Sequence, residues 1–314
     1  MKTSECIKSY CERNKWLKQC RTEDENDLNI QLYGGVPYYS SEEGVKLLSR
    51  MIQSGEPFFV GRFGETELRT MDCYERLWYS PISLHRVNRD ICVNAGFFPR
   101  RVTHIRKYCE LKKDAMKDMD VLGLCLWNNE EYYVNKYMSL NACFLGNILD
   151  PLYWEDSWTA CLAGKKVLII HPFAATILNQ YNQKRQYLFP NTNILPVFQL
   201  RIIKAVQSIG GKGTSEYANW FDALEHMKTQ IRECDFDIAL LGCGAYGLPL
   251  AAYIKQLGKQ AIYVGGALQL MFGIRGKRWE NAQHVSRYLN DYWVHPSVQE
   301  TPESYANIES GCYW

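Results

Sequence analysis

The chain has 314 residues and a formal net charge of +2, with 46% hydrophobic and 22% charged residues. These values are ordinary for a soluble protein with a substantial core, and the small net charge does not favour nucleic acid as a partner. The 12 cysteines include no C-x-x-C pair and no zinc-ligand spacing, so we expect free thiols in a reducing, cytoplasmic compartment.

Residues 1–35 are polar and mixed in charge, and the N-terminus lacks the apolar core of a signal peptide. We expect a helix near Glu5–Arg21 and assign residues 1–40 to an N-terminal helical arm. A single α/β domain over residues 41–314 would follow, opening with a helix from Glu42 to about Gln53 that Ser40 or Ser41 caps.

The stretch Phe58–Leu68, FFVGRFGETEL, combines a buried strand with a turn that can bind charge. An apolar run after Pro57 predicts the strand, and glycines then flank Arg62. A strand that turns into a helix leaves backbone N–H groups pointing outward, and arginine adds a bidentate donor for phosphate. We therefore interpret Arg62 and Gly64 as a site for the diphosphate of a nucleotide.

Two acids, Glu65 and Glu67, follow this turn and admit two interpretations. They could hold a divalent cation such as Mg²⁺ or Mn²⁺, which takes oxygen ligands and bridges to a diphosphate. Alternatively, they lie in the first turn of a helix, where acids are favoured by the helix dipole. Residues two apart on a regular helix point about 200° away from one another, so the metal site requires an irregular turn.

The middle of the chain alternates between predicted loops, helices and strands. We expect a long loop over Tyr79–Arg101, a helix from about Val102 to Lys117 and a strand over Asp120–Leu126. Lys165–His171 predicts a further strand with His171 at its tip, where ligands bind in open α/β sheets. A histidine there could equally contact a ligand or serve as a cap. Ile194–Phe198 is predicted as another strand, and Asn219 as the cap of a helix.

The second informative stretch is a strand–turn–helix–strand pattern within Asp235–Trp279. The expected elements are a strand at Ile238–Leu241, a helix at about Leu248–Leu257 and a strand at Ala261–Val264. Three glycines in the turn between the first strand and the helix fit G-x-G-x-x-G in its required context: Gly242, Gly244 and Gly247.

A dinucleotide-binding enzyme should also carry an acid about 20 residues beyond this turn. No acid occurs from Ala245 through Trp279, whereas the loop after the last strand carries Arg275 and Lys277. This combination favours a nucleoside diphosphate over NAD, with the alternative that the loop is an ordinary solvated cationic turn. Together the elements predict an α/β fold, a Rossmann-like and mostly parallel sheet with helices on both faces.

Two of these motifs resemble those of the GT-D fold glycosyltransferases, a group first defined as a domain of unknown function in bacterial glycan gene clusters. RFGETE resembles its R-[FY]-G-D-G-E element, and GCGAYGLPLAAYIKQLGKQAIYVGG resembles its later glycine turn, helix and strand. The resemblance spans about two-thirds of the chain, from Pro57 to Gly266. It departs from the group's acid-x-acid element by having Glu65 for aspartate and Thr66 for glycine.

The resemblance implies a hexosyltransferase that takes a nucleotide-sugar, expected to be a UDP-sugar, and transfers its sugar to a glycan, lipid-linked or protein-linked acceptor. It implies the GT-D type of fold and metal and donor binding at Glu65 and Glu67. We expect peripheral association with a membrane and no transmembrane segment. Glu67 and His171 are the candidates for the general base. A Rossmann-type oxidoreductase and a non-catalytic nucleotide-binding domain are the alternatives.

Overall fold

The computed structural model describes residues 31–76, 81–211 and 213–314, so the helix predicted near Glu5–Arg21 lies outside the described residues. Seven strands form one sheet in the order β5-β4-β3-β9-β8-β6-β7, and every pairing between them is parallel. A separate antiparallel pair, β1 (Leu32–Tyr33) and β2 (Val36–Pro37), precedes the sheet. The strands of the sheet are β3 (Phe58–Arg62), β4 (Val121–Leu124), β5 (Ala142–Leu145), β6 (Lys166–His171), β7 (Gln199–Lys204), β8 (Ile238–Leu241) and β9 (Gln260–Tyr263).

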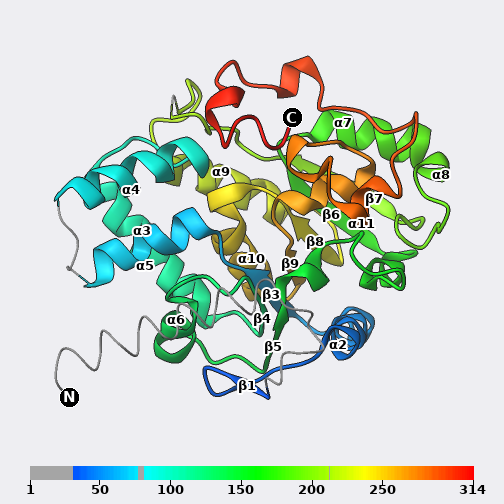
Figure 1. Ribbon diagram of the computed structural model, residues 1–314, viewed down its shortest axis with the longest axis horizontal. Coiled ribbons are helices and arrows are strands. Elements are labelled where there is room, and N and C mark those ends of the chain that lie inside the picture. Colours follow the sequence, from blue (N-terminus) through cyan, green and yellow to red (C-terminus); the bar gives the residue numbers. More distant parts are fainter. Residues whose placement is uncertain (1–30, 77–80, 212) are drawn as a thin grey trace.

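Helices cover both faces of the sheet, as the sequence predicts (Figure 1). The described helices are α2 (Ser41–Ser54), α3 (Glu65–Arg76), α4 (Pro81–Asn94), α5 (Val102–Lys117), α6 (Glu130–Tyr137), α7 (Ala174–Asn179), α8 (Arg185–Leu188), α9 (Trp220–Glu233), α10 (Gly247–Gln256) and α11 (Gln283–Ser286).

Alternate residues of each strand point into two separate cores. Phe59 packs in one core with residues of α3, α4, α5, α9 and α10, the helices of one face. Phe58 and Val60 pack in the other core, with residues of α2, α7, α8 and α11. Because both faces are buried, the central strands are apolar throughout rather than alternating.

The order of the strands brings distant parts of the chain together at the centre of the sheet. From β3 the chain moves outward through β4 to the edge strand β5. It then starts the other half with β6 and the edge strand β7, and returns through β8 to β9, which pairs with both β8 and β3. The two predicted motifs, after β3 and after β8, therefore end at the same edge of the sheet with only β9 between them.

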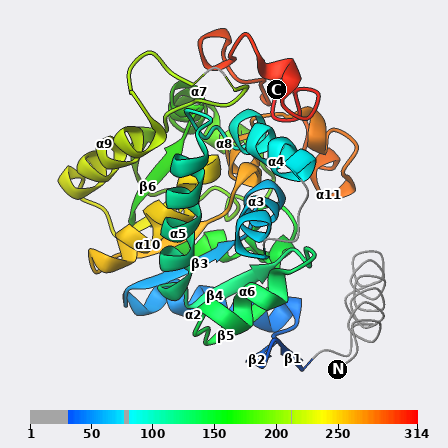
Figure 2. The same ribbon diagram turned by 90° about the vertical axis from the view of Figure 1, so that its left-hand side faces the viewer.

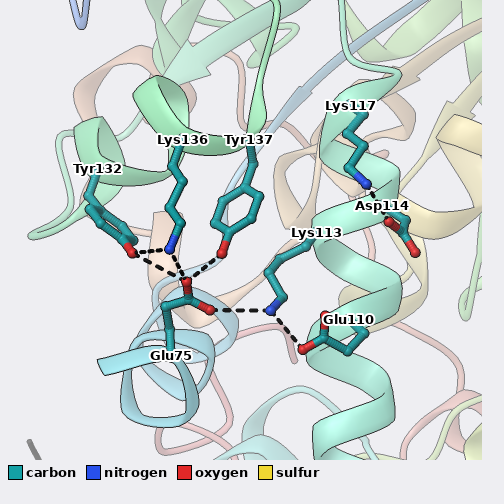
Figure 3. Close-up of polar contacts among 8 residues, drawn as sticks. All are labelled: Glu75, Glu110, Lys113, Asp114, Lys117, Tyr132, Lys136 and Tyr137. Atoms are coloured by element: carbon teal, nitrogen blue, oxygen red, sulfur yellow. Dashed lines mark hydrogen bonds and ion pairs between the residues drawn. The ribbon is translucent and has the colours of Figure 1, made fainter. Parts of the chain in front are cut away.

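Helix α3, which follows the first motif, is held at its far end by a polar cluster (Figure 3). The carboxylate of Glu75 accepts hydrogen bonds from Lys136 and Tyr137 of α6 and from Lys113 of α5, the last at 3.2 Å. Partial burial opposes ionisation, but these hydrogen bonds lower the pKa of Glu75 to about 2. The cluster fixes α3 against two neighbouring helices, all on the face seen in Figure 2.

Several predicted elements match the structure, while others are wrong. Helix α5 has the predicted bounds, and the Asn219 carboxamide caps α9 by accepting the N–H groups of Phe221 at 2.9 Å and Asp222 at 3.2 Å. The predicted loop over Tyr79–Arg101 instead contains α4. The strand predicted at Ile194–Phe198 lies later, as β7.

The window 238–254, free of charged residues, folds as β8, a turn and most of α10. In the part of the chain that the structure describes, no helix has the length and apolar character needed to cross a bilayer. Every cysteine within that part is a free thiol.

Candidate functional site

A cavity of about 720 Å³ opens at the carboxyl edge of the sheet. Residues that end or follow each of the seven strands line it, together with residues of the C-terminal segment, whose red ribbon crosses this edge in Figure 1. Ligand sites of α/β proteins lie at this edge, and their volumes are usually about 300–1,000 Å³. The cavity therefore has the place and the size of a small-molecule site.

Arg62, the last residue of β3, lines this cavity. Charge interaction with Cys125 raises the pKa of Arg62, although burial acts to lower it. Tyr263, Tyr313 and Glu130 raise it by smaller amounts. Within the described residues, no hydrogen bond or ion pair occupies the guanidinium. A fixed positive charge with unused donors is thus available to an anionic ligand.

Helix α3 begins at Glu65, and its first turn is regular because the N–H of Leu68 donates to the carbonyl of Gly64 at 3.0 Å. Both acids line the cavity, but Glu65 is exposed whereas Glu67 is buried, with its carboxylate folded over Gly64. Two residues apart on a regular helix, the acids diverge. The irregular turn that a shared cation requires is not formed, so this pair does not fit a metal held by both acids.

A metal centre built from other residues is also not evident in the described ranges. They contain no group of three or more histidine, cysteine, aspartate or glutamate side chains able to hold an ion. The divalent cation stays a prediction from the sequence.

The three glycines of the second motif have different surroundings. Gly244 has a φ of +56°, and a Cβ there would come no closer than 3.5 Å to the carbonyl oxygen of Ala95, so its backbone faces open space in the cavity. A Cβ at Gly242 would lie 2.6 Å from the ring of His171. At Gly247 it would lie 2.1 Å from the ring of Tyr263, and Gly247 does not line the cavity. Gly242 and Gly244 thus shape the cavity, whereas Gly247 serves packing.

His171 ends β6, lines the cavity and is only 2% exposed. Burial lowers its pKa to about 3, so the imidazole is neutral near pH 7. Its Nδ1 accepts the N–H of Phe173 at 3.0 Å, which places the single proton of the neutral ring on Nε2. This arrangement favours a hydrogen-bond donor over the predicted general base.

The cationic loop after β9 contributes a residue other than those predicted. Arg275 and Lys277 do not line the cavity, and the Lys277 side chain instead reaches the carbonyl of Ser310 at 3.5 Å. Arg278, the next residue, lines the cavity and forms an ion pair with Glu309 of the C-terminal segment. The charge run in the sequence indicated the loop correctly but not which cation enters the cavity.

Sequence reasoning also missed Glu130, at the start of α6. Its fully buried carboxylate accepts the N–H groups of Cys125 at 3.2 Å and Leu126 at 2.7 Å. Burial raises the pKa of Glu130 to about 7, against those hydrogen bonds. The bonds fix the turn after β4, in which Leu126 has a φ of +54°, and so place Cys125 and Trp127 on the cavity wall. The available signal was an adjacent pair of acids, Glu130 and Glu131, within an aromatic cluster.

No protein-family model matches the chain, and no curated protein matches it. Solved structures of one group are similar to it in fold. Two are structures of the domain of unknown function 1792, one of them selenomethionine-substituted and the other described as a distinct glycosyltransferase fold. Each is 12% identical, covers 88% of this chain and 95% of its own, and has a TM-score of 0.46.

A third similar structure is a glycosyltransferase of the same group from Streptococcus sanguinis. It is 12% identical, covers 87% of this chain and 98% of its own, and has a TM-score of 0.39. The group that these structures represent is the one that the two sequence motifs resemble.

Proposed function

We propose that the chain is a glycosyltransferase of the hexosyltransferase class, which takes a nucleotide-sugar, expected to be a UDP-sugar, as donor. The observation that carries this proposal is the guanidinium of Arg62, which has no hydrogen-bond or ion-pair partner in the part of the chain that the structure describes, beside two glycine-lined strand ends. A Cβ at Gly265, after β9, would lie 3.8 Å from Cδ of Arg62, so the arginine side chain lies beside the carboxyl end of β9, the strand between β3 and β8. The diphosphate would lie between these groups.

The chemistry follows from the charges around that position. In glycosyl transfer the bond between the sugar carbon and the diphosphate oxygen breaks while an acceptor oxygen bonds to the same carbon. Negative charge grows on the leaving diphosphate, and a preorganised cation such as Arg62 stabilises it. The Nε2–H of His171 is available as a further donor, to the diphosphate or a sugar hydroxyl.

Glu67 is the carboxylate best placed to receive the proton of the acceptor hydroxyl or to bind a hydroxyl of the donor sugar. It is 7% exposed and lines the cavity, and no hydrogen bond within the described residues occupies it. By resemblance, the acceptor would be a glycan, either lipid-linked or protein-linked. A dinucleotide-dependent oxidoreductase gains no support, because Gly265 and Gly266 stand at the end of β9, where a ribose-binding acid would be needed.

Calorimetric titration with UDP, a panel of UDP-sugars and NADH tests the proposal, with release of UDP from each sugar nucleotide as the assay of turnover. We expect UDP to bind and Arg62→Ala to weaken it at least tenfold, since charge-assisted hydrogen bonds contribute about 1.5–3 kcal/mol each. Arg86→Ala is the matched control, because Arg86 is an exposed arginine of α4 outside the cavity. Binding of NADH but not UDP would reject the proposal. UDP binding without turnover of any donor would indicate a non-catalytic nucleotide-binding domain.

A further inference from the structure

The rim of the cavity carries a second cation, Arg278, which is engaged by the protein itself. It forms an ion pair with Glu309, and the two side chains are 39% and 46% exposed. The guanidinium also lies 4.8 Å from the ring centroid of Tyr313 and donates to its hydroxyl at 3.3 Å. All three residues line the cavity. The only carboxylate that Arg278 contacts among the described residues therefore comes from the C-terminal segment.

The backbone around Glu309 is held in an unfavourable conformation. Glu309 and Ser310 have φ values of +45° and +61°, a region that side chains other than glycine rarely adopt. Gly311 follows with +78°. Such backbone persists where surrounding contacts hold it, and it is concentrated at ligand clamps and switch regions. The turn thus presents the Glu309 carboxylate to Arg278 at a local conformational cost.

Within this turn the Cys312 thiol donates to Oε2 of Glu309 at 3.5 Å, but the contacts that anchor the segment to the rest of the protein do not use the Glu309 carboxylate. The backbone N–H of Arg278 donates to the carbonyl of Cys312 at 3.0 Å, and that of Lys277 donates to the carbonyl of Trp314 at 3.3 Å. Before the turn, the buried carboxylate of Glu300 accepts the N–H of Ala175 at 2.7 Å. The segment is anchored on both sides, so the Glu309 side chain can leave Arg278 while the cavity wall remains in place.

We propose that Arg278 is a second anion subsite of the cavity, which takes a phosphate group of the ligand, and that Glu309 is its internal occupant until the ligand displaces it. Guanidinium groups bind carboxylate and phosphate with the same planar, paired donors. The exposed ion pair with Glu309 is weak, and a phosphate carries more negative charge than a carboxylate. A phosphate can therefore displace Glu309 from the donors of Arg278. The assignment of the ligand as a nucleotide-sugar rests on the proposed function, but the subsite itself can be tested with inorganic pyrophosphate.

The test is calorimetric binding of pyrophosphate and of UDP to the wild type, Glu309→Gln, Arg278→Gln and the double variant. If Glu309 competes with the ligand, Glu309→Gln should bind both anions about twofold to fivefold more tightly, the range that loss of an exposed pair allows. Arg278→Gln should bind at least tenfold more weakly, and the double variant should match Arg278→Gln alone. Glu303→Gln is the control, since Glu303 is an exposed carboxylate of the same segment outside the cavity.

Several outcomes would overturn the subsite. These are unchanged or weaker binding by Glu309→Gln, unchanged binding by Arg278→Gln, and failure of the wild type to bind either anion. Melting curves accompany each variant, and Glu309→Ala repeats the comparison if the glutamine variant does not fold. Pyrophosphate binding that responds as expected, without turnover of any sugar nucleotide, would support the subsite while rejecting the proposed transferase.

Discussion

The carboxylate of Glu67 lies directly over the α-carbon of Gly64. A Cβ at position 64 would meet Oε2 of Glu67 at 2.0 Å and its Cδ at 2.6 Å. Glu67 therefore requires glycine at position 64. Its side chain can turn back over the start of α3 only because Gly64 has no side chain. This contact gives the spacing of glycine and acid in RFGETE a physical reason.

We predict that Gly64→Ala separates folding from activity. The new methyl group meets the end of a flexible side chain, so the Glu67 carboxylate should move while the fold persists. A misplacement of about 1 Å can lower turnover by about 10²-fold. Donor turnover and a melting curve check this. Gly55→Ala is the control for turnover, because no neighbour lies within 4 Å of that helix end, although its φ of +74° costs about 1 kcal/mol of stability. Full activity would show that the position of the Glu67 carboxylate is immaterial.

The two acids of the first motif should respond differently to substitution. Because Glu65 and Glu67 diverge on a regular helix, we expect Glu65→Gln to retain turnover and Glu67→Gln to lose most of it. If the two acids instead shared a cation, each variant would lose one of its ligands, and both variants would need a higher metal concentration for activity. Chelator titrations of the wild type and both variants distinguish these cases.

Alanine at Gly244 and at Gly247 should also have opposite effects. At Gly244 there is room for a methyl group, so the cost is that of a left-handed residue, about 1 kcal/mol, while UDP binding is lost as the turn narrows. At Gly247 the methyl group would overlap the ring of Tyr263 at 2.1 Å, so stability should fall by about 1–3 kcal/mol or more. Urea denaturation and UDP titration of both variants test this. Equal stability losses would contradict it.

Glu75 should make the stability of the protein dependent on acid pH. Its folded pKa of about 2 lies below the unfolded value, so its contribution is present above about pH 4.3 and is lost as the pH falls towards 2. Glu75→Gln should cost about 1.5 kcal/mol at pH 7, since the cluster is only partly buried, and flatten this part of the stability profile. Asp114→Asn is the control in Figure 3, because the Asp114–Lys117 pair is exposed and should contribute little to stability. A Glu75→Gln profile parallel to that of the wild type would argue against this role.

Two adjacent lysines of α5 offer a matched comparison. Lys112 is 1% exposed and has no ion pair or hydrogen bond within the described residues, and burial lowers its pKa although the charge of Glu67 opposes this. Lys113 bonds to Glu75 at 3.2 Å and to Glu110 at 2.7 Å. We therefore expect Lys112→Met to preserve or raise stability and Lys113→Met to lower it, as measured by urea denaturation. A larger loss for Lys112→Met would reveal a stabilising partner for its ammonium group.

The parts of the fold that the sequence predicted are those where local pattern and burial agree. Both predicted motifs have apolar strands ended by glycine, and the structure places them at β3 and β8. Helix α4 was missed because its buried side includes Asn88 and Asp90, which bond to Tyr74 at 2.8 Å and Arg69 at 2.6 Å and thus interrupt the apolar period. Strand β7 was misplaced because it lies at the edge of the sheet and carries charged residues at Arg201 and Lys204.

The candidate site divides in the same way. Arg62 and Gly244 could be predicted because each belongs to a short strand-and-turn pattern that forms the same local structure in different folds. The pairing of Arg278 with Glu309 could not, since it depends on how a segment 31 residues away in the chain crosses the cavity. His171 was placed correctly at a strand tip, but its proton position depends on a hydrogen bond from Phe173 that the residue pattern does not reveal.

The central place of β9 has a consequence for how the protein acquires its activity. It is the last strand of the sheet in chain order, yet it lies between β3 and β8. During synthesis, the first half of the sheet can form early, but β3 has no partner on its inner side until residues beyond 260 emerge from the ribosome. Insertion of one strand then joins the halves, a non-local step that we expect to be slow. The edge of the sheet that would hold the proposed nucleotide is thus incomplete until β9 has been made.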